Sequence, residues 1–324
     1  MLVVRHSSAN ANISKDTQNP RLVVAGGFVQ IRSFAKINLF LDVIGKRADN
    51  YHNIESVMQE LDFGDNISIS IPIKKGFRGF SRDALISVFQ PTQNVTLEVT
   101  GITEGFPLDE DNLIIKAVKT LLREHRITGN LHIKVEKNIP MGAGLGGGSS
   151  NCAATLLGVN EIFQLNTPME RLMELAKSLG ADVPFCLMGG TALAEGIGEK
   201  LTPLTPHPPC YVVLAFPRIP VHTAETYKRL TELGDGSRRQ EFIKAYETNN
   251  IDEISGAFYN IFTEITAARN LEIPKLISDL KNYGAISASM TGTGPTVFGY
   301  FRTQAEARAA CDNIKAKTIL TQIN

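Results

Sequence analysis

The stretch Pro140-Met141-Gly142-Ala143-Gly144-Leu145-Gly146-Gly147-Gly148-Ser149-Ser150-Asn151 decides the fold, because five of its twelve residues are glycine and two hydroxyls follow them. The alternation of apolar and polar residues over 131–136 predicts a strand before it. A helix is predicted after it, since apolar residues recur at helical spacing at Cys152, Leu156, Val159 and Phe163. Glycine permits positive φ and a close approach to a ligand, and a helix N-terminus attracts anions. The stretch therefore predicts a phosphate-binding loop rather than a flexible turn.

Two common phosphate loops do not fit this stretch. A P-loop needs a lysine and then Ser or Thr directly after its last glycine, and no lysine follows the glycines here. The spacing Gly142-x-Gly144-x-x-Gly147 does match a dinucleotide fingerprint. That fingerprint belongs in the first strand-turn-helix of a parallel sheet, with an acidic residue about 20 positions later at a strand end. This loop lies in mid-chain, and the later region predicts the start of a helix, so we set both alternatives aside.

The composition narrows the class of protein. A chain of 324 residues suggests two domains or one large one. Its 33 basic and 33 acidic residues cancel, so neither nucleic acid nor a membrane surface is favoured as a partner. Its four cysteines lack metal-site spacing and predict free thiols in a reducing compartment, the cytoplasm. Residues 1–27 are polar and lack a secretory signal, so we expect a flexible extension or an early start codon, with a transit peptide as the alternative.

Polar residues interrupt apolar surroundings at two other places in the chain. Strand alternation over 33–41 places Lys36, Asn38 and Phe40 on one face, and an edge strand facing water is the alternative explanation. Asp182 lies just after a predicted helix, within an otherwise apolar stretch. A buried carboxylate is costly unless it is paired or hydrogen-bonded. Asp182 is therefore a candidate functional residue, and a turn-capping aspartate is the alternative.

Local patterns predict the remaining elements. Strands are expected at 54–61, 66–73, 95–99, 211–216, 285–291 and 296–301. One helix should run from an acidic cap at 109–112 to about Glu124, and another from Pro168 to Leu179 with Thr167 as its cap. Residues 241–282 should be mostly helical, and 304–316 should form a closing helix. Residues 203–209 are the candidate linker, and 74–93 are weakly patterned and suggest an insertion or hairpin.

The sequence Pro-x-Gly-x-Gly-Leu-Gly followed by Ser-Ser resembles the phosphate loop of the GHMP kinase superfamily. Residues 35–39 resemble its first motif and residues 289–298 its third, in the right order. The resemblance implies an α+β, two-domain fold. It implies a ribosomal S5-like ATP-binding domain at 28–203, a ferredoxin-like α/β substrate domain at 204–324, and an active site in the cleft between them.

Six further blocks resemble one subfamily, the 4-diphosphocytidyl-2-C-methyl-D-erythritol kinases of the non-mevalonate route to isoprenoids. These blocks lie at 36–39, 47–52, 110–113, 147–151, 180–184 and 194–199. The subfamily usually has glycine where this chain has Asn50, and asparagine also tolerates positive φ, so we expect the loop to keep its shape. Residues 1–27 lie outside the pattern, and 74–93 match it poorly.

The resemblance implies transfer of the γ-phosphoryl group of ATP to the 2-hydroxyl of the methylerythritol moiety. Asp182 would be the general base and Lys36 its partner, which orients the hydroxyl and stabilises developing negative charge. Residues expected to bind ATP are Pro140, Met141, Gly142, Ala143, Gly144, Leu145, Gly146, Gly147, Gly148, Ser149 and Ser150 for the phosphates, and Asn112, Leu113 and Lys137 for adenine. Residues expected to bind the cytidyl substrate are Asn38, Tyr51, His52, Thr223 and Tyr227, with Tyr51 and Tyr227 clamping the base. Residues expected to support the phosphate loop are Gly292, Thr293 and Gly294.

Mg²⁺ is implied together with ATP, and no protein ligand is assigned to it, because Mg²⁺ commonly binds through phosphates and keeps its waters. The chain is expected to act as a monomer or weak homodimer on small molecules. Two other functions remain in competition. One is another GHMP kinase, of the homoserine or mevalonate type. The other is a binding protein without turnover, which is disfavoured because both Lys36 and Asp182 are present.

Overall fold

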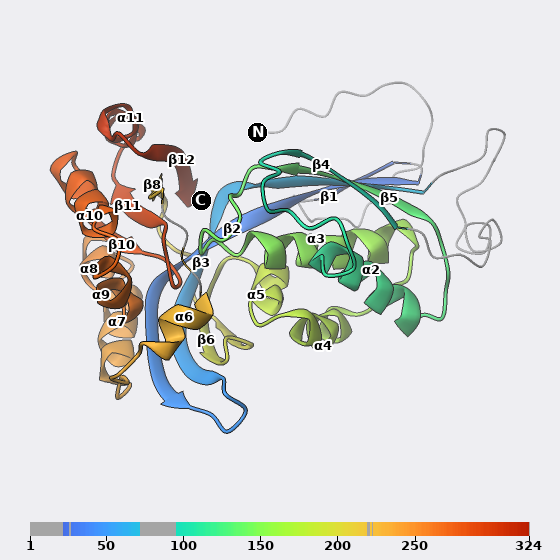
Figure 1. Cartoon of the computed structure of the whole chain (residues 1–324), viewed down its shortest axis with the longest axis horizontal. Helices are drawn as coiled ribbons and strands as arrows, with labels where there is room; N and C mark the ends of the chain where they lie inside the picture. The colour runs from blue at the N-terminus through green and yellow to red at the C-terminus, as the bar shows by residue number, and fades with distance from the viewer. Residues whose placement is uncertain (1–21, 26, 72–94, 219–220, 222, 324) are drawn as a thin grey trace.

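The computed structural model describes residues 22–25, 27–71, 95–218, 221 and 223–323 (Figure 1). The expected insertion at 74–93 lies outside these residues, as do residues 1–21. The sheet begins earlier than residue 28, the expected start of the first domain, because Leu22–Ala25 forms strand β1. This segment is rich in strand-forming residues and pairs antiparallel with the start of β2, from Leu22 opposite Ile31 to Ala25 opposite Phe28.

In the part of the chain that the structure describes, eight strands build the larger sheet, in the order β1-β2-β3-β5-β4, with β6, β7 and β9 attached beside this path. Besides β1, their bounds are Phe28–Lys46 (β2), His52–Ser70 (β3), Val95–Gly101 (β4), Leu131–Lys137 (β5), Thr191–Gly196 (β6), Lys200–Pro203 (β7) and Tyr259–Asn260 (β9). The last of these lies beyond residue 203 and still pairs with β2, so the larger sheet crosses the expected domain boundary.

The antiparallel pair β2 and β3 forms the longest ribbon of the molecule (Figure 1). Two separate strands were expected at 54–61 and 66–73, and this is wrong, because β3 runs unbroken from His52 to Ser70. It changes partner along its length: Ile54–Gln59 pairs with β6, and Asn66–Ser70 pairs with β5. Between these two segments Glu60 pairs with Lys36 of β2, and Gly64 and Asp65 pair with Phe34 and Ser33, with a register shift between the two sets of pairs.

Four helices cover one face of the larger sheet (Figure 1). They are Leu113–Glu124 (α2), Gly147–Ile162 (α3), Met169–Leu179 (α4) and Val183–Met188 (α5). The N-cap of α2 is Asn112, whose side-chain oxygen accepts a hydrogen bond from Ile114 N at 2.9 Å. Thr167 was expected to cap α4, and this is wrong: Pro168 occupies the N-cap position, and the Thr167 hydroxyl is hydrogen-bonded to His125 Nε2 at 2.7 Å.

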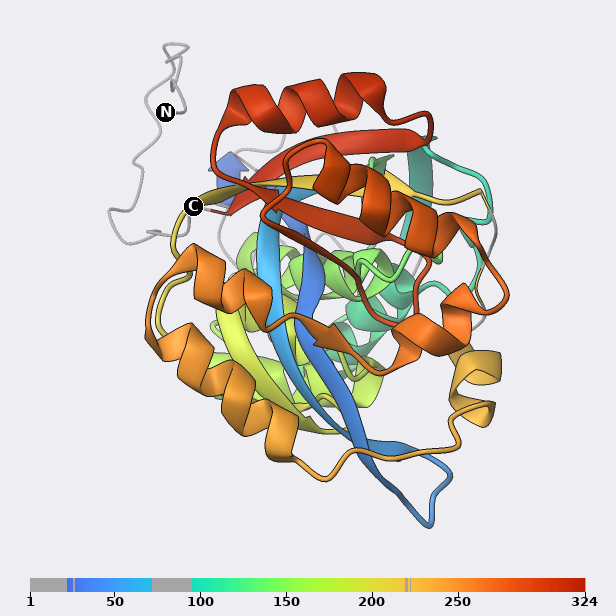
Figure 2. The same ribbon diagram turned by 90° about the vertical axis from the view of Figure 1, so that its left-hand side faces the viewer.

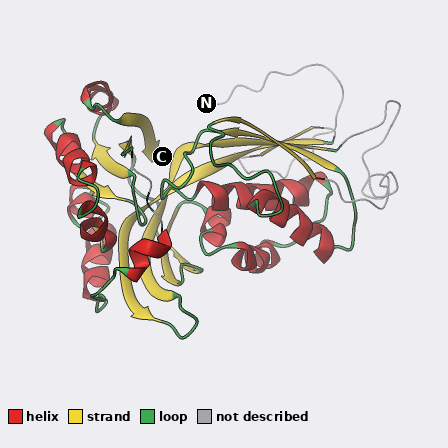
Figure 3. Cartoon of the chain, in the orientation of Figure 1, coloured by secondary structure: helices red, strands yellow, loops and turns green. Residues whose placement is uncertain are grey.

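The smaller sheet has four antiparallel strands in the order β10-β11-β8-β12. They are Cys210–Phe216 (β8), Ser287–Met290 (β10), Val297–Phe301 (β11) and Lys317–Ile323 (β12). Six helices accompany them: Thr223–Lys228 (α6), Ser237–Glu247 (α7), Ile251–Gly256 (α8), Phe262–Ala267 (α9), Glu272–Asn282 (α10) and Gln304–Asn313 (α11). Figures 2 and 3 show this second group of helices apart from the first, with strands between the two groups.

Alternation along β8 joins two hydrophobic cores. Cys210, Val212 and Leu214 pack into a core shared with the middle of β2, while Val213 and Ala215 pack into a core with α10 and α11. The connection at 203–209 is a linker between the sheets, but it is packed rather than free. His207 is 4% exposed, and its ring lies 5.5 Å from the ring of Tyr300. Among the described residues, no helix combines the length and apolar character needed to cross a bilayer.

Candidate active site

A shift in the pairing of β2 with β3 turns Lys36 and Asn38 into the protein. Odd-numbered side chains before the bulge, such as Val29 and Ile31, pack toward the helices of the larger sheet. After the register shift between Phe34 and Lys36, the odd-numbered Ala35, Ile37 and Leu39 pack toward the smaller sheet instead. Lys36 and Asn38 are only 4% and 2% exposed. The alternative of a water-facing edge strand is therefore wrong.

Lys36 and Asp182 form an ion pair at this point. The distance from Lys36 Nζ to Asp182 Oδ2 is 3.2 Å, and the side chain of Asp182 remains 31% exposed. Lys36 Nζ also donates to Asn38 Oδ1 at 3.0 Å. Asp182 lies directly before α5, yet its side chain makes no capping hydrogen bond there. The alternative of a turn-capping aspartate is therefore wrong, and its carboxylate faces Lys36 instead.

The glycine loop has the backbone conformation that only glycine adopts easily. Gly142, Gly144 and Gly146 have φ of 64°, 77° and 68°. Gly146 is the N-cap of α3, and a Cβ there would lie 3.0 Å from Lys36 Cγ. The N–H groups of Gly147, Gly148 and Ser149 precede the first helical hydrogen bond, from Ser150 N to Gly146 O. The loop thus points free backbone donors and a helix N-terminus at the region beside Lys36.

The third sequence motif packs on the glycine loop, backbone against backbone. A Cβ on Gly144 would lie 2.8 Å from the carbonyl oxygen of Thr291, and one on Gly292 would lie 3.4 Å from that of Gly144. Asn260 Nδ2 holds this motif by donating to Gly292 O and to Met290 O, both at 2.8 Å. The structure therefore brings Gly292, Thr293 and Gly294 to the phosphate loop, as expected. Their effect on phosphate binding stays a prediction.

A second ion pair lies beneath the glycine loop, and sequence reasoning missed its acid. Lys137 Nζ lies 2.6 Å from Asp65 Oδ2, and their side chains are 1% and 0% exposed. Asp65 Oδ1 also accepts from the backbone N–H groups of Asn138 (2.7 Å) and Ile139 (2.8 Å). Burial lowers the pKa of Lys137, and the Asp65 carboxylate opposes that shift. Asp65 thereby anchors the segment that leads into Pro140.

Other residues expected to bind ATP lie around the start of α3. The Asn112 amide caps α2 and also donates to Pro107 O at 2.6 Å. Leu113 follows it, and a Cβ on Gly148 would lie 3.9 Å from Leu113 Cδ1. Ser150 is 3% exposed and turned to the sheet, with its hydroxyl 2.9 Å from that of Ser33. Asn112 and Leu113 thus flank the loop, and their contact with adenine stays a prediction.

The residues expected to bind the cytidyl group lie at the β2–β3 hairpin and on α6. Asn50 has φ of 66°, the positive φ expected of a residue that stands where the subfamily usually has glycine. The Tyr227 ring lies 5.0 Å from the His52 ring and 4.7 Å from the Phe262 ring, and burial raises the pKa of Tyr227 to about 12. Tyr51 is 60% exposed. The structure thus pairs Tyr227 with His52 rather than with Tyr51, and a clamp on the base stays a prediction.

The start of α6, at Thr223, also contacts the third sequence motif, residues 289–298. Thr223, the first residue of α6, lies with its hydroxyl 3.0 Å from the hydroxyl of Thr293. Thr266 Oγ1 donates to the carbonyl of Thr293 at 3.2 Å. Thr223, expected at the substrate, is therefore joined to the loop that supports the glycines.

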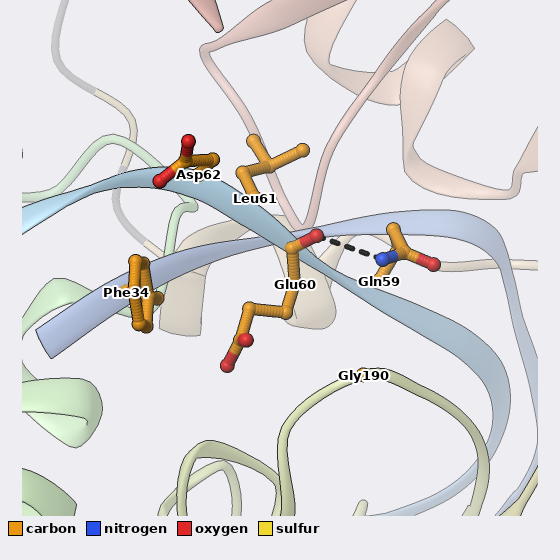
Figure 4. A pocket seen from close by; sticks show the side chains of 6 residues that line it. All are labelled: Phe34, Gln59, Glu60, Leu61, Asp62 and Gly190. Atoms are coloured by element: carbon orange, nitrogen blue, oxygen red, sulfur yellow. Dashed lines mark hydrogen bonds between the residues drawn. The ribbon is translucent and has the colours of Figure 1, made fainter. Parts of the chain in front are cut away.

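A small cavity of about 140 Å³ lies beside the part of β3 between its pairing with β6 and its pairing with β5 (Figure 4). In Figure 4 the side chains of Phe34 and Glu60 lie on the side of β3 that faces Gly190. The lining residues are Phe34, Gln59, Glu60, Leu61, Asp62 and Gly190. None of them is a predicted site residue, so we assign this cavity no part in the site.

A glycine loop at a helix N-terminus, beside the partly exposed ion pair of Lys36 and Asp182, defines a class of protein, the small-molecule kinases built from two α/β parts. Residues 112–190 match the GHMP kinases N terminal domain, and residues 242–319 match the GHMP kinases C terminal domain. The 4-diphosphocytidyl-2-C-methyl-D-erythritol kinase of Lachnoclostridium phytofermentans is 38% identical over 87% of this chain and 91% of its own. That of Alkaliphilus metalliredigens is 35% identical over 88% of this chain and 92% of its own. The chain belongs to the GHMP kinases and, among them, to the 4-diphosphocytidyl-2-C-methyl-D-erythritol kinases.

Solved structures agree with this family. A crystal structure of a 4-(cytidine 5'-diphospho)-2C-methyl-D-erythritol kinase is 26% identical, covers 90% of this chain and 98% of its own, and gives a TM-score of 0.71. A homoserine kinase from Cytophaga hutchinsonii has a TM-score of 0.68 at 18% identity, with 94% of this chain and 97% of its own covered. The second likeness shows the shared fold alone. The two-domain GHMP kinase fold is thereby confirmed.

Proposed function

We propose that the chain transfers the γ-phosphoryl group of ATP to the 2-hydroxyl of 4-diphosphocytidyl-2-C-methyl-D-erythritol, a step of the non-mevalonate isoprenoid route. The observation that carries the proposal is the position of the Lys36–Asp182 pair, whose lysine stem packs on Gly146 at the start of α3. A hydroxyl beside this pair would lie next to phosphates held by the glycine loop. Relatives that align along most of this chain bear the name of that kinase.

Asp182 would act as the general base. Its carboxylate is partly exposed and bound on one oxygen by Lys36, so it can accept the proton of an attacking hydroxyl. Lys36 would neutralise charge that develops on the oxygens in the transition state. Phosphoryl transfer asks mainly for alignment and charge neutralisation, and general base catalysis typically contributes about 10² to 10⁴-fold. Asn38 would then act next to the reacting hydroxyl, through its contact with Lys36.

ATP would bind at the glycine loop, with its phosphates on the N–H groups at the start of α3. We propose that Mg²⁺ accompanies the triphosphate. In the described ranges, no group of three or more His, Cys, Asp or Glu side chains is placed to hold a metal ion. The ligands of Mg²⁺ would be phosphate oxygens and water. Chelation of Mg²⁺ should abolish turnover, and its re-addition should restore it.

The cytidyl end would bind near His52 and Tyr227, where an aromatic surface meets hydrogen-bonding groups. Tyr51, which precedes His52 in the chain, is exposed and would cover the base from the other side. We further propose a cytoplasmic enzyme that acts as a monomer or weak homodimer. The described cysteines are all free thiols, which agrees with a reducing compartment.

The test is a steady-state assay with ATP-Mg²⁺ and each candidate acceptor. We expect turnover of the cytidyl substrate, with little or none of homoserine and mevalonate. Turnover of homoserine or mevalonate without the cytidyl substrate would overturn the substrate assignment but keep the kinase. Tight binding of the substrates without product would favour the non-catalytic alternative.

A further inference from the structure

Ser56 in β3 is a buried polar residue that the mechanism above does not use, although it contacts the site. Its side chain is 0% exposed. Its hydroxyl donates to the carbonyl oxygen of Phe40 at 2.7 Å and accepts from Asn38 Nδ2 at 2.8 Å. A hydroxyl has one proton. Since that proton is committed to Phe40, Ser56 can act toward Asn38 only as an acceptor.

This acceptor determines which way the Asn38 amide points. With Nδ2 on Ser56, Oδ1 faces the opposite side, where it accepts from Lys36 Nζ at 3.0 Å and from Thr291 Oγ1 at 3.3 Å. If the amide were flipped, Nδ2 would face the Lys36 ammonium, donor against donor. Oδ1 would then face a Ser56 oxygen whose proton is already used. The network therefore has one consistent orientation.

Thr291, which is distant from Asn38 in the sequence, contacts both the side chain and the backbone of Asn38. It is 0% exposed and follows β10 of the smaller sheet, and its hydroxyl accepts from the backbone N–H of Asn38 at 2.9 Å. The bulge in β2 between Asn38 and Phe40 makes this geometry possible, because it brings the Phe40 carbonyl and the Asn38 side chain to the same hydroxyl.

We propose that Ser56 is a positioning residue for phosphoryl transfer, which holds the Asn38 amide so that its oxygen aligns the Lys36 ammonium. An ammonium has three N–H donors. One goes to Asn38 and one faces Asp182, which leaves the third for an oxygen of the substrate or phosphate. Without Ser56, the amide can rotate and Lys36 loses its alignment. The inference rests on the proposed function, of which it names one further residue.

The first experiment compares Ser56→Ala with the unchanged chain, using ATP-Mg²⁺ and the cytidyl substrate. We expect kcat to fall about tenfold, because the buried Asn38 Nδ2 donor loses its acceptor and the amide is no longer held in one orientation. Both KM values should change less than kcat. The matched control is Ser255→Ala, a serine that is 1% exposed and bonded to Asp252 O in α8. A normal kcat in Ser56→Ala would overturn the proposal.

A double-mutant cycle separates this role from a purely structural one. If Ser56 acts only through Asn38, adding Ser56→Ala to Asn38→Ala should cause no further loss of kcat. Losses that multiply in the double variant would place the effect elsewhere and overturn the proposal. The unchanged chain is assayed first on all three acceptors. A failure of the proposed function therefore shows as a different acceptor, and the cycle is then measured on that acceptor.

If Ser56→Ala fails to fold, Ser56→Thr and Ser56→Val decide the matter, since the two side chains share one shape and only threonine keeps the acceptor. Both should be compared at equal folded fraction, measured by circular dichroism. We expect the threonine variant to recover most of kcat and the valine variant to lose it. Equal kcat in the two variants would overturn the proposal.

Discussion

Two Lys–Asp pairs flank the glycine loop, and they differ in burial and in how fully the acid is bonded. Lys137 and Asp65 lie 2.6 Å apart with side chains 1% and 0% exposed. Lys36 and Asp182 lie 3.2 Å apart with side chains 6% and 31% exposed. Asp65 also accepts from two backbone N–H groups, whereas Asp182 makes no capping bond to α5.

These differences in exposure and hydrogen bonding are those expected between a structural carboxylate, Asp65, and a general base, Asp182. A carboxylate whose oxygens are saturated by protein donors has no place for a substrate proton. It is also costly to disturb, because its burial is compensated only by those donors. A carboxylate that is partly exposed and bonded on one oxygen can take a proton and return it to solvent. We propose that the same pair of residue types holds the loop at one end and takes part in catalysis at the other.

The most direct test of the partly exposed Lys36–Asp182 pair is Asp182→Asn. We expect kcat to fall by about 10² to 10⁴-fold because the base is lost, while KM for ATP and the free energy of unfolding change little. Steady-state kinetics and thermal unfolding measure these quantities. Asp312→Asn, at an exposed position of α11, is the control and should be neutral. A near-normal kcat in Asp182→Asn would rule out the base role.

The buried pair should respond in the opposite way to Asp65→Asn. Removing the charge leaves the Lys137 ammonium buried without its partner, which costs about 3 to 5 kcal/mol of unfolding free energy. KM for ATP should rise, since the segment entering the glycine loop loses its anchor. Denaturant unfolding and ATP titration are the measurements.

The matched control for Asp65→Asn is Asp62→Asn on the same strand, whose exposed pair with Arg32 is worth about 0 to 1 kcal/mol. If both variants lost equal stability, the contrast between the two Lys–Asp pairs would fail. A stable Asp65→Asn variant with unchanged KM for ATP would also contradict the contrast, because Asp65 would not be an anchor.

At the cytidyl side, Tyr227→Ala should raise KM for the cytidyl substrate about tenfold, because aromatic stacking on a base is worth about 1 to 3 kcal/mol. KM for ATP should change less. Tyr227→Phe keeps the ring and should stay close to normal, and Tyr283→Ala, at an exposed ring, is the control for removal of a tyrosine. Equal increases in both KM values would contradict a role in base binding.

The sequence predicted the parts of the site that carry a local signature. The glycine loop, Lys36 and Asp182 stand out because glycines between a strand and a helix, and charges within apolar runs, are visible over a few residues. Asp65 and Ser56 could not be found in this way. Each looks like an ordinary polar residue on a strand, and its partners lie far away in the sequence or depend on a bulge.

The register of the strands could not be predicted from local sequence patterns either. Two strands were expected at 54–61 and 66–73, but a Cβ at Gly64, which lies between them, would be 2.1 Å from Ser33 O. Glycine there permits a close crossing of β2 and β3 instead of a turn. Bulge positions in β2 and the change of partner along β3 are set by register between distant segments, which periodicity does not contain. The family resemblance predicted the two-domain architecture, whereas the register of β2 and β3 is known from the structure.

A buried carboxylate of a different kind gives the smallest expected effect. Asp42 is 1% exposed, and among the described residues its Oδ2 has no hydrogen-bond partner, so burial raises its pKa. A folded-state pKa above the unfolded value means that stability present at acidic pH is lost as pH rises through that interval, from about 3.8 upward. Asp42→Asn should remove this loss. Its unfolding free energy relative to the unchanged chain should therefore rise between pH 4 and neutrality, as measured by urea unfolding at each pH. A relative stability that falls with pH would mean that Asp42 is a satisfied anchor like Asp65.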